Sequence, residues 1–228
     1  MKYNLQQHGI GWRGNLFQSF RTGLTDGDVY QFGVWDGFSL QVLGELTNAI
    51  PMNRHNRFFG FDVFTGMPTE QNEPDKQRDD PGSFNLLRHY GVTNLEDALR
   101  LLQFDIMQNL NGNAELTLVQ GLVEQSLTTE LLEHGNLGKA FYVDFDMDIY
   151  SPTRYAFDFL VEHKIIVEGT IIGFDDWGQC FPQHDIFTYG ESRAFKEVSE
   201  KYGIQTVKIV ETENHGQTAF IVTKIANI

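Results

Sequence analysis

Acidic side chains gather at two places in the sequence, each directly after an apolar run. Asp144, Asp146 and Asp148 alternate after residues 140–143, and Asp175 and Asp176 follow residues 169–174. If these runs are neighbouring parallel strands, their carboxylates converge at one edge of the sheet and repel one another. A hard divalent ion held by carboxylate oxygens and water relieves that repulsion, and Mg²⁺ is the expected choice. The sequence therefore predicts a metal site.

A second candidate site is the glycine turn in residues 28–39. A β-prone start runs into Gly33 and Gly37, and helix-forming residues follow from Ser39. This strand, turn and helix N-terminus is the arrangement that brings backbone close to a nucleotide-like ligand. The turn has neither a GxGxxG run nor a phosphate-binding lysine, which favours a ligand without phosphate, such as S-adenosylmethionine. Ser39 is expected to cap the helix or to donate to the ligand.

Asp62 ends the next apolar run, residues 58–61. An acidic residue at the carboxyl end of the strand that follows a glycine turn suits a ribose diol, because its carboxylate can accept both hydroxyl protons. The polar stretch that follows, 69–82, is too long for a simple connector and is predicted to be a lid.

Apolar runs and helical stretches alternate along the rest of the chain. Strands are expected near 115–119, 140–143 and 169–174, and a hairpin at 205–223. Helices are expected over 83–109, with a break at Gly91, and over 126–134, 151–161 and 191–202. This order predicts an α/β fold with an open, doubly wound, mostly parallel seven-stranded sheet and a C-terminal antiparallel hairpin. We expect residues 1–27 to form a cap or lid and residues 28–228 a single domain.

Composition restricts the function classes. A chain of 228 residues with a formal net charge of −14 lacks the basic surface that nucleic acid or an anionic membrane requires. The charge suits an enzyme for a neutral or cationic small molecule. A single cysteine, Cys180, indicates a reducing cytoplasm. We expect no membrane helix, and the N-terminal segment could also serve as a dimer arm, which makes a homo-oligomer an option.

Four stretches together resemble the macrocin O-methyltransferase family of class I S-adenosylmethionine-dependent methyltransferases. Residues 31–39 (QFGVWDGFS) are similar to the family's E-F-G-V-x-x-G-x-S, and residues 60–68 (GFDVFTGMP) to G-F-D-S-F-x-G-L-P. Residues 146–153 (DMDIYSPT) are similar to D-x-D-L-Y-x-P-T, and residues 169–177 (GTIIGFDDW) to G-G-x-I-x-x-D-D-Y. The resemblance runs from about residue 28 to the C-terminus.

The resemblance implies an enzyme that transfers a methyl group to a hydroxyl of a sugar or natural product with the help of Mg²⁺. It implies Mg²⁺ ligands at Asp146, Asp175 and Asp176, with Asp146 as the catalytic group. The implied cofactor-binding residues are Gln31, Gly33, Val34, Trp35, Gly37, Ser39, Asp62, Gly121 and Asp144.

Two departures from the family pattern bear on the site. Gln31 stands where the family has an acidic residue, which weakens the expected contact to the amino group of the cofactor. Asp144 is an extra carboxylate, placed as in catechol-type methyltransferases, so either Asp144 or Asp146 could be the first metal ligand. A catechol-type phenolic O-methyltransferase and a non-catalytic cofactor-binding protein are the alternatives. The missing GxGxxG run argues against a nicotinamide oxidoreductase.

Overall fold

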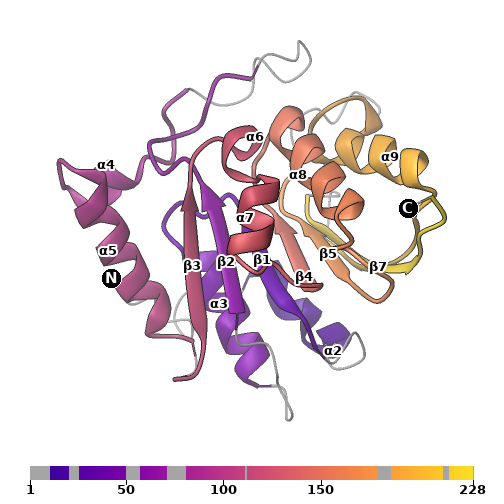
Figure 1. Cartoon of the computed structure of the whole chain (residues 1–228), viewed down its shortest axis with the longest axis horizontal. Coiled ribbons are helices and arrows are strands. Elements are labelled where there is room, and N and C mark those ends of the chain that lie inside the picture. The colour runs from indigo at the N-terminus through magenta and orange to yellow at the C-terminus, as the bar shows by residue number, and fades with distance from the viewer. Residues whose placement is uncertain are drawn as a thin grey trace.

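The computed structural model describes residues 11–20, 26–49, 57–70, 81–110, 112–178, 186–212 and 216–227. These residues form a seven-stranded sheet in the order β3-β2-β1-β4-β5-β7-β6 (Figure 1). The first five strands in this order, β3, β2, β1, β4 and β5, pair with their neighbours in parallel. Strand β7 runs antiparallel to both β5 and β6. The predicted fold class is confirmed, including the C-terminal antiparallel hairpin. The strands are β1 (Asp28–Phe32), β2 (Arg57–Asp62), β3 (Glu115–Gln120), β4 (Ala140–Phe145), β5 (Ile171–Phe174), β6 (Gln205–Glu211) and β7 (Thr218–Lys224).

Helices cover both faces of the sheet (Figure 1). One face carries α6 (Val123–Ser126), α7 (Thr129–His134), α8 (Tyr150–Glu162) and α9 (Gly190–Tyr202). The other carries the 3₁₀ turn η1 (Trp12–Leu16), α2 (Phe17–Phe20), α3 (Phe38–Asn48), α4 (Leu86–Tyr90) and α5 (Leu95–Met107). A further 3₁₀ turn, η3 (Ile186–Thr188), precedes α9. None of these helices is long and apolar enough to cross a membrane.

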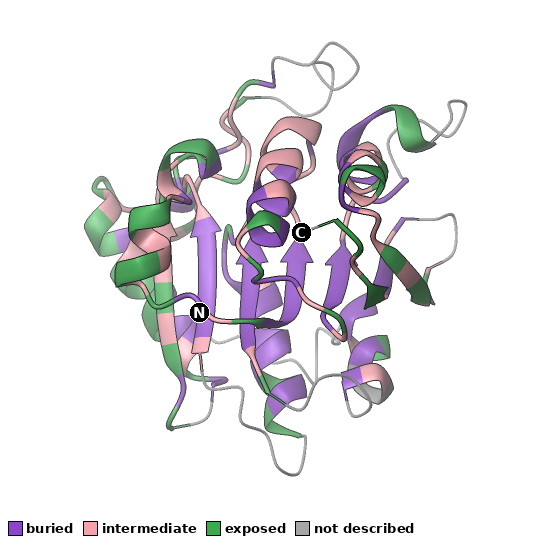
Figure 2. Ribbon diagram, turned by 45° about the vertical axis from the view of Figure 1, so that its right-hand side comes forward, coloured by how far each residue is buried: buried purple, intermediate pink, exposed green. Residues whose placement is uncertain are grey.

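The central strands are the most deeply buried part of the molecule (Figure 2). Every residue of β1, β4 and β5 is buried, whereas the edge strands β3 and β6 consist of partly and fully exposed residues, with Val210 of β6 as the buried exception. Strands covered by helices on both faces need apolar side chains on both sides, which is why their sequences read as continuous apolar runs. The carboxyl ends of these strands are therefore held on a rigid frame.

The break expected at Gly91 is present: Gly91 ends α4 in a left-handed conformation (φ 66°), and α5 follows as a separate helix. Two other predicted local features differ from the structure. The helix predicted over 126–134 begins later, as α7, where the Thr128 side chain accepts a hydrogen bond from the Leu131 N–H. Helix α3 is capped by Gly37 rather than by Ser39, so Ser39 is not a cap.

The described part of the N-terminal segment is built into the fold. Leu16 is fully buried, and the Phe20 ring packs edge-on against Phe141 of β4 with centroids 4.8 Å apart. Trp12 lies over Gly173 of β5, where an added Cβ would come within 2.9 Å of the indole ring. Residues 11–20 therefore form part of the core on the α3 face.

Several predictions concern residues outside the described ranges. These are residues 1–10 and 21–25 of the cap expected at 1–27, residues 71–80 of the lid expected at 69–82, Cys180, and residues 213–215 of the hairpin expected at 205–223.

We expect Gly173→Ala to lower stability by about 1–3 kcal/mol, since its Cβ would overlap a packed side chain. That Cβ would lie 2.1 Å from the Tyr142 hydroxyl and would also meet Trp12. Urea unfolding measures the loss. Gly112→Ala is the matched control, because nothing lies within 4 Å of its added Cβ. Equal stability of the two variants would contradict the docking of Trp12 on the sheet.

Candidate active site

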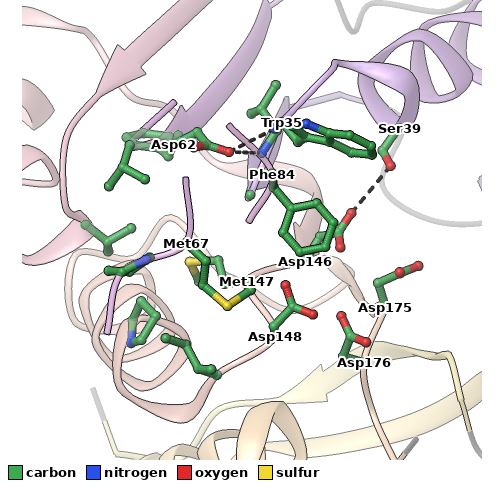
Figure 3. Close-up of a pocket in the computed structure, with 18 of the residues that line it drawn as sticks. Trp35, Ser39, Asp62, Met67, Phe84, Asp146, Met147, Asp148, Asp175 and Asp176 are labelled. Atoms are coloured by element: carbon green, nitrogen blue, oxygen red, sulfur yellow. Dashed lines mark hydrogen bonds between the residues drawn. The ribbon is translucent and has the colours of Figure 1, made fainter. Parts of the chain in front are cut away.

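A cavity of about 890 Å³ lies at the carboxyl ends of the parallel strands. This volume is near the upper end of the range for small-molecule sites. Figure 3 shows acidic side chains from two strands facing the same space as the glycine loop. Nine of the twelve predicted site residues line the cavity: Gly33, Val34, Trp35, Ser39, Asp62, Gly121, Asp146, Asp175 and Asp176. Gln31, Gly37 and Asp144 are not among its lining residues.

Both predicted loop glycines have positive φ, 85° at Gly33 and 76° at Gly37. A Cβ at Gly33 would lie 1.8 Å from the backbone oxygen of Asp146, and one at Gly37 would overlap Ile106 and Leu102 of α5. The glycines are therefore required by close packing of the protein against itself. Their effect is to bring the loop after β1 against the loop after β4, so that the two predicted sites are neighbours.

Asp62 fastens the glycine loop to β2. Its Oδ2 accepts hydrogen bonds from the backbone N–H groups of Val34 (2.8 Å) and Trp35 (2.9 Å), and its Oδ1 accepts one from Phe64 (2.6 Å). Burial raises the pKa of Asp62, and these backbone donors act against that rise. The role seen directly is thus to shape the loop, and the predicted contact to a ribose stays a prediction.

Three carboxylates at the ends of β4 and β5 form a compact group. One oxygen each from Asp146, Asp175 and Asp176 lies within 4.8 Å of the others. Three carboxylate oxygens are a suitable donor set for a hard divalent ion, so these residues fit Mg²⁺. Asp144 lies outside this group, fully buried within β4, where it accepts a hydrogen bond of 2.7 Å from the Tyr142 hydroxyl.

A guanidinium group already lies among these carboxylates. Arg13 of η1 pairs through Nη2 with Asp144 (2.8 Å) and Asp146 (3.0 Å), and through Nη1 with Asp175 (3.2 Å). Next to it, the Trp12 indole N–H donates to Asp175 Oδ1. Arg13 is 6% exposed. Arg13 was not among the predicted site residues, because nothing local in residues 11–15 indicates a partner 131 residues away.

The carboxylates and Arg13 alter each other's ionisation. Burial disfavours the charge of Arg13, but Asp144, Asp146 and Asp175 outweigh it and raise the pKa of Arg13 above its ordinary value. Burial also raises the pKa of Asp146; Arg13 opposes that rise, and Asp175 adds to it. Arg13 therefore stays charged, while Asp146 is a carboxylate with an increased affinity for a proton.

Two glutamates that were not among the predicted site residues hold the segments around the site. Glu191, fully buried in the first turn of α9, accepts from the Met147 N–H (3.2 Å) and from the Asp176 N–H (3.0 Å). Glu70 accepts from both the N–H and the hydroxyl of Ser151, in the first turn of α8. Glu191 thus joins the loops after β4 and β5. The only sequence signal for Glu191 was the presence of an acidic residue at the start of a predicted helix.

The remaining wall of the cavity is largely apolar. Trp35 and Phe84 are 39% and 42% exposed, and their rings meet edge to face with centroids 5.2 Å apart. Met67 and Met147 lie on the other side of the Phe84 ring in Figure 3. Large exposed aromatic groups beside a cavity provide surface on which a planar ligand can pack.

Comparisons with known proteins agree with this architecture. No protein-family model matches the chain, and no curated protein matches its sequence. Among solved structures, the calicheamicin methyltransferase CalS11 is similar at 21% identity and a TM-score of 0.58, over 96% of this chain and 80% of that one. The O-methyltransferase NovP is similar at 17% identity and a TM-score of 0.58, over 92% and 80%. The likeness establishes the fold: this chain has the same Rossmann-like arrangement of strands and helices as these two methyltransferases.

We expect Glu191→Gln to destabilise the protein by roughly 1–3 kcal/mol, since one amide nitrogen would replace an oxygen that accepts from a buried N–H. Glu191 serves two such N–H groups, so one of the loops after β4 and β5 must lose its anchor. Thermal unfolding measures the change. Glu200→Gln, on an exposed position of the same helix, is the control. A Glu191 variant as stable as this control would contradict the anchoring role.

Proposed function

We propose that the protein is an S-adenosylmethionine-dependent O-methyltransferase that acts on a hydroxyl group of a sugar or natural product. The observation that carries the proposal is that the glycine loop and the acidic triad line one cavity. The Ser39 hydroxyl donates to Asp146 Oδ2 over 3.5 Å, linking the two (Figure 3). The neighbours support it, since CalS11 is also described as a TDP-rhamnose 3'-O-methyltransferase.

The cofactor would lie along the loop from Gly33 to Ser39. Gly33, Val34, Trp35 and Ser39 line the cavity there, and Gly121 lines it from the end of β3. Asp62 Oδ1 accepts one backbone hydrogen bond, so this oxygen has a lone pair left for a ribose hydroxyl. Gln31 and Asp144 do not line the cavity, so they would affect cofactor binding only indirectly, through the strands that carry the loops.

Asp146, Asp175 and Asp176 would hold a Mg²⁺ ion. That ion would bind acceptor oxygens and lower the pKa of the hydroxyl to be methylated. Asp146 is favoured over Asp144 as the first ligand, because Asp146 lines the cavity and belongs to the carboxylate group described above. Asp144 is fully buried and lies outside the carboxylate group, so it gives little support to the catechol-type alternative.

In the proposed reaction, the acceptor oxygen attacks the sulfonium methyl carbon in line with the breaking carbon–sulfur bond. The bonding pair stays on sulfur, which leaves S-adenosylhomocysteine, and the hydroxyl proton passes to a base. Asp146 is proposed for that role, because its carboxylate lines the cavity beside the other two site aspartates. The protein's main contribution is to position the two reactants.

The charge of the cavity favours an uncharged or cationic acceptor. Among the described residues that line the cavity, Arg13 is the single basic one. Eight are acidic: Asp36, Asp62, Glu70, Glu124, Asp146, Asp148, Asp175 and Asp176. Arg13 is itself committed to three of the site's aspartates. The acceptor proposed for this chain therefore differs from the one named for CalS11, because a sugar that carries a diphosphate, as TDP-rhamnose does, would be repelled by these carboxylates. The single cysteine keeps the cytoplasm as the proposed location.

Asp175→Asn is expected to remove Mg²⁺-dependent methyl transfer, by about 100-fold or more, while S-adenosylhomocysteine still binds. The variant lacks one carboxylate of the proposed metal group but leaves the glycine loop unchanged. Transfer of tritiated methyl groups measures turnover, and calorimetry measures cofactor binding. Activity that persists in excess chelator would refute the metal's role, and absent cofactor binding would refute the methyltransferase itself.

Acceptors that differ only in charge test the acidic cavity. In a panel of matched sugars and catechols with amino, acetamido or phosphate substituents, we expect phosphate-bearing members to react at least about tenfold more slowly at low salt. Added salt should narrow the difference, because it screens the carboxylates. Faster methylation of the phosphate-bearing members would contradict the proposed acceptor class, and a preference for catechols would contradict the sugar assignment.

A further inference from the structure

We propose that Arg13 is a positioning residue of the acidic triad and that it competes with the divalent cation, so that metal binding undocks the Trp12–Arg13 end of η1. This inference rests on the metal component of the proposed function. It concerns the free protein and needs no acceptor. Two cations of different kinds, a guanidinium and a metal ion, would share the same carboxylates.

The two sets of partners overlap. Arg13 pairs with Asp144, Asp146 and Asp175, and the metal group consists of Asp146, Asp175 and Asp176. Two of the three metal ligands are therefore already bound to a positive charge, at 3.0 and 3.2 Å. A divalent ion on those ligands would lie close to the guanidinium, and like charges at such separations repel one another in a partly buried site more strongly than in water.

Arg13 accounts for the geometry of the triad without a metal. Neighbouring carboxylates repel one another unless a cation lies between them. The planar guanidinium reaches three carboxylates at once, which a lysine ammonium with its single nitrogen would do poorly. The Nε of Arg13 adds a hydrogen bond of 2.9 Å to Asp144 Oδ2. In this state Arg13 holds Asp146 and Asp175 toward each other as the metal would.

The segment that carries Arg13 is anchored at one end. Leu16 and Phe20 are buried in the core, and they tie the C-terminal end of the segment to the sheet. At the other end, Arg13 is held by its ion pairs to the acidic site, whereas Trp12 is held both by its indole bond to Asp175 and by packing on β5. A metal that takes over Asp146 and Asp175 would remove the ion pairs and the indole bond, so that only the packing of Trp12 would still hold this end.

Coupling of this kind is reciprocal. If the metal weakens the docking of Arg13, then docking of Arg13 weakens metal binding by the same factor, which is about 5- to 150-fold for typical coupled sites. The protein would bind its metal tightly only when the N-terminal segment has moved.

Limited trypsin digestion of the full chain tests the proposal, because trypsin cuts after arginine and Arg13 is 6% exposed. We expect the Arg13–Gly14 bond to resist cleavage in chelator and to be cut at least about fivefold faster in saturating Mg²⁺, as seen by mass spectrometry of the fragment that begins at Gly14. Asp176→Asn should abolish the acceleration and keep the protection, since the ion pairs of Arg13 to Asp144, Asp146 and Asp175 stay. Cleavage that Mg²⁺ does not change would overturn the proposal.

The reciprocal measurement is Mn²⁺ binding, followed by the electron paramagnetic resonance of the free ion. Arg13→Gln should bind Mn²⁺ at least about fivefold more tightly than the unmutated protein. Arg100→Gln, which removes an exposed arginine paired with Glu96 on α5, should not differ. Equal or weaker binding by the Arg13 variant would overturn the proposal. Calorimetry with S-adenosylhomocysteine reports separately on the methyltransferase assignment, which these outcomes leave untouched.

Discussion

The arrangement of the site is determined by the repulsion among its carboxylates. Asp144, Asp146, Asp175 and Asp176 come from two adjacent strands, and the sheet fixes their backbones close together. The surrounding structure supplies the positive charge and the donors that they need: the Arg13 guanidinium, the Trp12 indole and the Ser39 hydroxyl. Segments far apart in sequence are therefore held at one edge of the sheet by electrostatics as much as by packing.

The same constraint offers a reason for Gln31. In the sheet register Gln31 lies beside Asp144 of β4, and both are fully buried. An acidic residue at position 31 would add a second buried negative charge next to Asp144, which is unfavourable. Neither side-chain polar atom of Gln31 has a hydrogen-bond partner among the described residues. The neutral amide at position 31 and the extra carboxylate at position 144 are thus best understood as a pair.

The sequence predicted what depends on local pattern. Continuous apolar runs identified the central strands, and the acidic residues after them located the cavity edge, because strand ends in a parallel sheet share one side. It did not predict Arg13 or Glu191. Asp144 lies 131 residues from Arg13, and the two partners of Glu191 lie 44 and 15 residues from it, so these pairings leave no periodic trace. The break between α6 and α7 was missed for a local reason. Thr128 caps α7 through a side-chain hydrogen bond, and threonine is not decisive as a cap signal.

The glycine loop and the acidic triad depend on each other through one close contact. Gly33 lies against the Asp146 carbonyl so closely that no side chain fits, and Asp62 holds the loop from the opposite side. Any shift of the loop after β1 must therefore move the backbone of Asp146, and with it the carboxylate that Ser39 and Arg13 contact. A ligand bound on the loop would consequently set the position of the proposed base. The rate of the proposed reaction depends on the alignment of the acceptor oxygen with the methyl carbon. A fixed position of Asp146 relative to the glycine loop would therefore favour methyl transfer.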